Sequence, residues 1–212
     1  MTPLREAYLL AGESAVGLIS DPMVEAAWLN ESALPRLSVG GLAAHLAGQL
    51  VFVVRTLDDP VRPAEQVGLL DHYTRVRWIG ADLDAEANVR IRDGGETEAA
   101  GGARAVARRA AESIRELRER LSAEPTHRIV RPPAGPWGLA LDDFLVTRMM
   151  EIVVHSDDLA CSIGVATPEL PSSVIEPVLT LLTALAVRRH GATALVRALS
   201  RAERAPATIA AI

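Results

Sequence analysis

The segment from Leu141 to Ile163 contains neither proline nor glycine, and its mixture of aliphatic and polar residues predicts a long helix. Glu151 and His155 are four residues apart, so a helix would place both side chains on one face. Three aliphatic residues, 152–154, separate them. Burying a carboxylate and an imidazole in such surroundings costs free energy unless each has a partner. The pair therefore either faces solvent or meets a partner, and a metal ion is one such partner.

The composition favours an all-α fold. Hydrophobic residues make up 49% of the 212 residues, whereas aromatic residues make up only 3%. The core must therefore consist of Ala, Leu, Val and Ile, and the first two have the highest helix propensities of this set. The length suits one domain, or one domain with a small appendage.

Charge, cysteine content and hydropathy restrict the class of partner and the compartment. The net charge of -5 argues against nucleic acid as the main partner, because phosphate binding requires a basic surface. The single cysteine, Cys161, excludes an intrachain disulfide and fits a reducing cytoplasm. We expect no signal peptide, and no run of about 18 uncharged apolar residues predicts a membrane span.

Apolar residues that recur every three or four positions, together with helix start and stop signals, predict the helices. The four long ones span residues 4–19, 38–57, 103–121 and 142–164, with Ser38 and Asp142 as N-caps and Gly164 as the stop of the fourth. Shorter helices are predicted at 24–28 and at 172–190, the latter capped by Ser172 or Ser173, with a short helix and a tail beyond. Residues 64–90 form a moderately amphipathic stretch, 93–102 are expected to be flexible, and 123–139 form a long proline-rich loop.

These elements predict a four-helix bundle with one or two long connections. We expect the bundle to occupy residues 1–165. Residues 166–212 are expected to form a C-terminal helical extension that packs on it.

A third metal ligand could come from the second long helix. His45 lies on the same apolar stripe as Leu42, Leu46 and Gln49, so it is expected to face the core. With Glu151 and His155 it would complete a set of two imidazoles and one carboxylate. Such a set binds zinc with positions left open, and it also accepts nickel or iron(II). The alternative is a hydrogen-bonded core histidine beside an ordinary Glu–His pair.

Several neighbours could support such a site. A ligating imidazole usually donates its second N–H to a carboxylate, for which Asp157 and Asp158 are candidates; otherwise both lie on a solvated surface. Arg148 precedes Glu151 by three residues and could orient it or bind an anionic substrate. The simpler interpretation of Arg148 is an ion pair with Glu151.

The remaining histidines and the cysteine are weaker candidates. His72 lies in a polar turn, His127 in the proline-rich loop, and His190 at a helix end, where the helix dipole explains a basic residue. Cys161 follows His155 by six residues and is off its face, so it is expected to be a packed small residue rather than a nucleophile.

Two segments carry a resemblance to a known family. The sequence SVGGLAAHLA at residues 38–47 is similar to the first motif of the DinB-like superfamily, and most resembles its actinobacterial branch, typified by mycothiol-dependent maleylpyruvate isomerase. The sequence RMMEIVVHSDDLA at residues 148–160 resembles the second motif of that branch, and Trp137-Gly138 before it is also similar. The resemblance covers about residues 5 to 165.

This resemblance implies an up-down-down-up four-helix bundle with a divalent metal, usually zinc, on His45, Glu151 and His155. It also implies mycothiol or a similar thiol as cosubstrate. The metal would lower the pKa of the thiol, and the thiolate would attack a small electrophilic substrate, giving S-transfer or isomerisation. Arg148 and Asp158 would support the site. The isomerase carries a separate C-terminal α/β domain, whereas the chain after Pro171 is predicted to be helical.

Two other functions are compatible with the sequence. The first is a non-enzymatic helical bundle that binds a metal structurally, or binds an apolar ligand or a partner helix. The second is a bundle whose role is to form a homodimer. An apolar face left exposed on the first or last helix would favour the latter.

Overall fold

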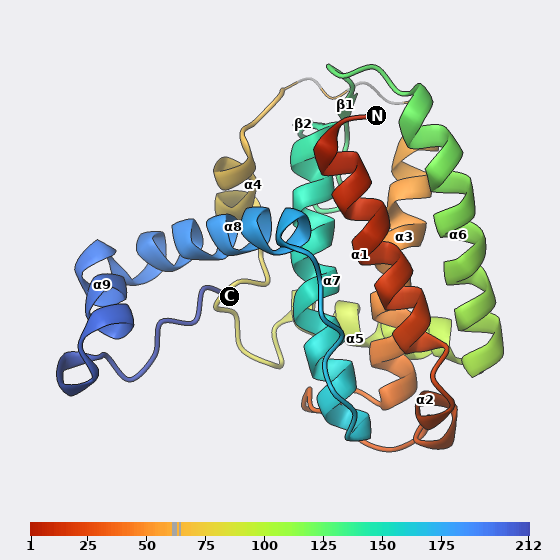
Figure 1. The fold of residues 1–212 in the computed structure, drawn as a ribbon, viewed down its shortest axis with the longest axis horizontal. Coiled ribbons are helices and arrows are strands. Elements are labelled where there is room, and N and C mark those ends of the chain that lie inside the picture. The colour runs from red at the N-terminus through yellow and green to blue at the C-terminus, as the bar shows by residue number, and fades with distance from the viewer. Residues whose placement is uncertain (61–62, 64) are drawn as a thin grey trace.

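The computed structural model describes residues 1–60, 63 and 65–212, and its main body is a bundle of four long helices. In Figure 1, α1 and α7 run in one direction and α3 and α6 in the other, which is the predicted up-down-down-up order. Each helix packs against two neighbours in the ring α1–α6–α3–α7. The bundle helices are α1 (Pro3–Ile19), α3 (Val39–Asp58), α6 (Ala103–Ala123) and α7 (Leu141–Ile163). The prediction of an all-α fold is confirmed.

Local capping chemistry accounts for several helix boundaries. The Ser38 hydroxyl accepts a hydrogen bond from the Gly41 amide at 2.9 Å, as predicted for the start of α3. Asp21 caps α2 (Pro22–Ala26) in the same way. Gly164 ends α7 with a φ of 71°, a left-handed conformation that glycine adopts without a steric penalty.

Two predicted caps are wrong. The N-cap of α7 is Ala140, and Asp142 lies inside its first turn, where it accepts hydrogen bonds from Thr2, the N-cap residue of α1, and from Arg5 of α1. The carboxylate thus joins two helices instead of closing one. Ser172 is the first residue of α8 (Ser172–His190), whose N-cap Pro171 makes no side-chain bond.

The prediction that residues 93–102 are flexible is also wrong, because α5 (Glu86–Ala99) extends through most of them. A Cβ atom added to Gly95 would lie 2.8 Å from the Gly41 carbonyl oxygen, so the glycine permits close approach of α5 to α3. Glu96 then accepts hydrogen bonds from the amide and hydroxyl of Ser38, at 2.7 and 2.9 Å. Tertiary contact with α3 therefore outweighs the weak helix propensity of this glycine-containing segment.

The connections around the bundle contain smaller elements. The amphipathic stretch at 64–90 includes α4 (Leu69–Arg75), which packs on α7, and Ala64 at its start lies outside the described residues. The proline-rich loop contains an antiparallel pair that the sequence did not predict, β1 (Ile129–Val130) with β2 (Leu139–Ala140).

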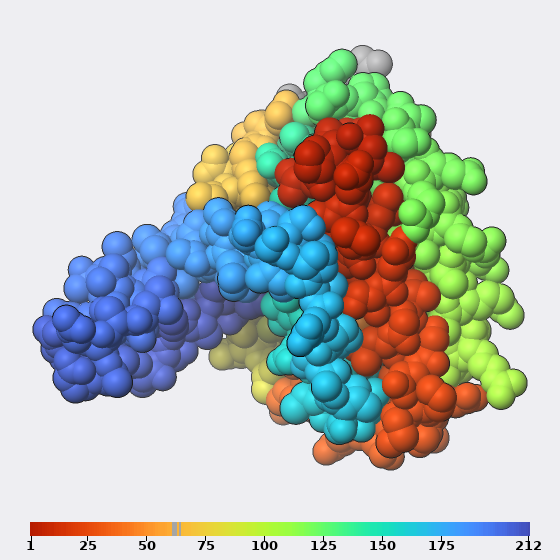
Figure 2. Space-filling view, viewed as in Figure 1, coloured from red at the N-terminus to blue at the C-terminus, as the bar shows by residue number. Residues whose placement is uncertain are grey.

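The C-terminal extension leaves the bundle as a projecting arm (Figures 1 and 2). The first turns of α8 bury Val174, Val178 and Leu181 and pack against α1 and α7. At its far end, α8 packs against α9 (Ala192–Ser200), which is followed by the 3-10 helix η1 (Ala202–Arg204). The division into a bundle at 1–165 and an extension at 166–212 stays a prediction.

Among the described residues, α3 is the one helix that is long and apolar enough to cross a membrane. However, 67% of its apolar stretch is buried inside the fold. Its apolar character is therefore accounted for by its position as a core helix of the bundle.

A buried arginine joins three of the bundle helices. Arg5 is 2% exposed, and its guanidinium donates to the Asp142 carboxylate at 2.9 Å. It also donates to three carbonyl oxygens at the C-terminal end of α6, at distances of 2.6 to 3.1 Å. One cation thus satisfies backbone acceptors that the end of a helix leaves without partners.

We predict that Arg5→Met lowers the free energy of unfolding by about 3 to 5 kcal/mol, because it removes the positive partner of a partly buried carboxylate and the guanidinium donors to three carbonyl oxygens. Arg104→Met is the control, because Arg104 is 87% exposed and pairs with Glu25 on the surface. Its expected cost is at most about 0.5 kcal/mol. Urea unfolding followed by circular dichroism measures both, and equal losses would contradict the prediction.

Candidate metal centre

The antiparallel packing of α3 against α7 brings His45, Glu151 and His155 together. One ligand atom from each lies within 4.8 Å of the others. The Nε2 atom of His155 is 3.1 Å from Glu151 Oε2, and the Nε2 atom of His45 is 3.8 Å from the same oxygen. In the described part of the chain, these residues form the one group of three or more His, Cys, Asp or Glu residues with such spacing.

The three side chains are largely buried but reach the surface at their edges. Their exposed fractions are 18% for His45, 13% for Glu151 and 17% for His155. The two imidazole rings meet edge to face, with centroids 4.8 Å apart and an interplanar angle of 83°. A ligand could therefore reach the group from one side while protein surrounds the other.

Burial and the contacts among the three side chains determine which of them are charged. Burial raises the pKa of Glu151, but the hydrogen bond with His155 and the nearby His45 and Arg148 outweigh it and hold the pKa below its usual range, so the carboxylate is ionised. Burial lowers the pKa of His45, so this imidazole is neutral at pH 7 and its lone pair is available. Burial also lowers the pKa of His155, but Asp158 and Glu151 outweigh it and raise the pKa to about 9.

Asp158 contacts the site as predicted, whereas Asp157 does not. The Asp158 carboxylate lies 3.0 Å from His155 Nδ1, which leaves Nε2 directed toward Glu151. Asp157 is exposed and accepts a hydrogen bond from Thr167 at 2.5 Å. Asp158 therefore holds the orientation of the His155 ring.

Arg148 is oriented toward a residue that the sequence did not single out. Its guanidinium donates to the side-chain oxygen of Gln49 at 2.7 Å and to the Thr147 hydroxyl at 3.0 Å. Within the described residues, no ion pair joins Arg148 to Glu151, so that interpretation is wrong. Gln49 follows His45 by one helical turn on the same stripe, and this spacing is the signal that could have identified it.

His72 and Cys161 differ from expectation. His72 is buried rather than in a polar turn, and its Nδ1 accepts a hydrogen bond from the Trp137 indole at 3.0 Å. Burial lowers its pKa to about 4. The charges of Arg148 and Glu151 act on His72, so α4 borders the site. Cys161 is exposed rather than packed.

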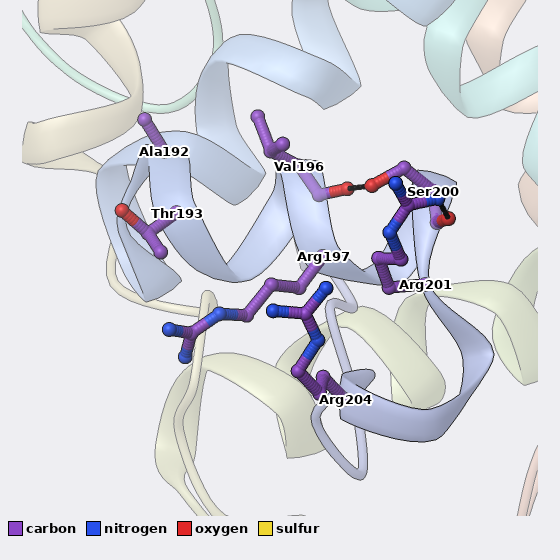
Figure 3. A pocket seen from close by; sticks show the side chains of 7 residues that line it. All are labelled: Ala192, Thr193, Val196, Arg197, Ser200, Arg201 and Arg204. Atoms are coloured by element: carbon purple, nitrogen blue, oxygen red, sulfur yellow. Dashed lines mark hydrogen bonds between the residues drawn. The ribbon is translucent and has the colours of Figure 1, made fainter.

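Two surface hollows lie away from the three residues. Figure 3 shows the first, of about 380 Å³, where arginine side chains of α9 and η1 gather. It is lined by Ala192, Thr193, Val196, Arg197, Ser200, Arg201 and Arg204. The second, of about 340 Å³, lies between α3 and the proline-rich loop. The arginines of the first are exposed and solvated, whereas the His–Glu–His group has the donor set and the partial burial of a metal site.

The fold and this group define a helical bundle of the kind that carries metal ligands on facing helices. The model of the mycothiol maleylpyruvate isomerase N-terminal domain family matches residues 11–160, and the chain belongs to this family. The matched range includes His45, Glu151 and His155. Searches of curated proteins and of solved structures found no match.

We predict that the metal-free protein loses stability as the pH rises from 6.5 to about 9. The pKa of His155 is raised from 6.5 to about 9 in the folded state, so its contribution is complete below pH 6.5 and is lost as the pH passes 9. The expected loss is about 1 to 3 kcal/mol.

Urea unfolding at several pH values in the presence of a chelator measures this loss. His155→Gln serves as the comparison, because it cannot take up the proton and should show a flatter profile over the same range. Parallel profiles for the two proteins would exclude His155 as the source.

Proposed function

We propose that the protein is a metal-dependent enzyme that uses mycothiol or a similar thiol on a small electrophilic substrate, by S-transfer or isomerisation. The observation that carries this proposal is the convergence of two imidazole nitrogens and one carboxylate oxygen within 4.8 Å. Membership of a family named for mycothiol supports the thiol as cosubstrate.

The residues fit a divalent ion held by His45, Glu151 and His155. Two nitrogens and one oxygen suit zinc, and they also accept nickel or iron(II). Glu151 supplies a negative charge, and His45 offers a neutral nitrogen. A bound ion would supply Lewis-acid chemistry that lowers the pKa of a thiol.

Residues around the three candidate ligands hold them in place and shield them from water. Asp158 holds the His155 ring by its Nδ1 atom, so that Nε2 is presented to the site. The aliphatic packing around α3 and α7 limits access of water to the inner side of the group. Thiol chemistry of this kind is expected in the cytoplasm of an actinobacterium.

One observation favours a second candidate, a non-enzymatic bundle with a structural metal. The three side chains are at most 18% exposed, and structural zinc sites are more enclosed than catalytic ones, which keep a position open. In that case, removal of a ligand would destabilise the fold, whereas in an enzyme it would remove thiol consumption and leave the fold intact.

We predict that the protein, purified without an affinity tag, binds about one zinc ion per chain. His155→Ala should weaken zinc binding at least about 100-fold, and Asp158→Asn about 10- to 100-fold, because the first removes a ligand and the second its orienting partner. His127→Ala, at an exposed loop position, is the control with unchanged affinity.

Elemental analysis and competition with a chromophoric chelator measure these affinities. Less than about a tenth of an equivalent of metal, with no uptake of added zinc, would contradict the metal site. Unfolding of His155→Ala together with loss of the ion would instead support the structural alternative.

A further inference from the structure

Gln49 lies between the metal centre and Arg148. Its side chain is fully buried, one helical turn after His45. The amide nitrogen donates to the His45 carbonyl oxygen at 3.0 Å and lies 3.3 Å from His45 Nε2. The amide oxygen accepts from Arg148 at 2.7 Å. The two ends of one amide therefore face two different neighbours.

These neighbours determine which way the amide points. A guanidinium only donates hydrogen bonds, and a carbonyl oxygen only accepts them. The amide oxygen must therefore face Arg148, and the nitrogen must face His45. A reversed amide would lose both bonds and would place its oxygen beside the His45 Nε2 atom, next to the candidate metal position. Amide oxygens are themselves metal ligands.

Two contacts fix the position of the Arg148 side chain. Its guanidinium is bonded to the buried Thr147 hydroxyl at 3.0 Å and lies over the Phe144 ring at 5.4 Å. Its positive charge acts on both His45 and Glu151. A positive charge that acts on two candidate ligands opposes the binding of a divalent ion there, so Arg148 does not itself help to hold the ion.

We infer that Arg148 is a positioning residue that turns the Gln49 amide oxygen away from the metal centre and so keeps a coordination position free for the thiol. The inference rests on the proposed function, because it requires an ion at His45, Glu151 and His155. It assigns Arg148 to keeping the site open, whereas the sequence suggested that it orients Glu151 or binds an anionic substrate.

The test uses the full chain loaded with Co(II), with 2-mercaptoethanol as the thiol probe. In Arg148→Met the Gln49 oxygen loses its donor, and only the bond from the amide nitrogen to the His45 carbonyl oxygen still opposes its turning toward the ion. We expect a changed Co(II) absorption spectrum, Co(II) affinity equal to or higher than that of the wild type, and thiol affinity at least about tenfold lower. The thiol-to-cobalt charge-transfer band measures the thiol affinity.

The double variant Arg148→Met/Gln49→Leu is the decisive control. It lacks the amide oxygen, so thiol affinity should return to within about threefold of the wild type, while a merely structural effect of losing Arg148 would persist. Thiol affinity unchanged in Arg148→Met, or equally low in both variants, would overturn the inference.

Two further results separate this inference from the proposed function. Wild-type protein that binds no Co(II) would contradict the function itself, and with it the inference. Wild-type protein that binds both Co(II) and the thiol, with Arg148→Met unchanged, would contradict the inference alone. If Arg148→Met does not fold, Arg148→Lys takes its place, because lysine keeps the charge without the paired donors. A partial loss of thiol affinity is then expected, and no loss would overturn the inference.

Discussion

The ionised carboxylate of Glu151 lies between two imidazoles in the middle of an aliphatic bundle, and much of the structure around it serves to satisfy it. Its hydrogen bond with His155 and its close approach to His45 offset the cost of burial. Those contacts exist only because α3 and α7 pack antiparallel, with His45 opposite the Glu151 turn. A second layer of contacts, from Asp158 to His155 and from Gln49 to His45, holds the imidazoles in place.

The contacts that hold the helices together involve other residues than the candidate metal ligands. Arg5 joins α1, α6 and α7 through Asp142 and the C-terminal carbonyls of α6. Close packing of α5 on α3 secures the helix that carries His45. The C-terminal extension packs its first turns on the bundle, and its far end, where α9 and η1 line the arginine-rich hollow, projects from it. A substitution in α9 therefore changes the arginine-lined hollow, whereas one in α7 can change the candidate metal centre.

Sequence patterns predicted the four bundle helices well, because each combines an apolar stripe with a recognisable start or stop. They failed where a contact from a distant segment decided the outcome. Residues 93–102 contain glycines that predict flexibility, yet one of them, Gly95, permits the close packing of α5 on α3. His72 was assigned to a polar turn from its neighbours in the chain, but Trp137 and burial determine its environment.

By itself, the sequence determined the all-α class and the bundle, and it made His45, Glu151 and His155 candidates for one site, because helical periodicity places Glu151 and His155 on one face and His45 on an apolar stripe. Only the tertiary structure decided what each polar neighbour does. Arg148 could bond to Glu151, to a substrate or to another helix, and the packing of α3 on α7 selected Gln49. Hydrogen bonds between helices depend on rotation and register in three dimensions, which the spacing of residues along one helix does not encode.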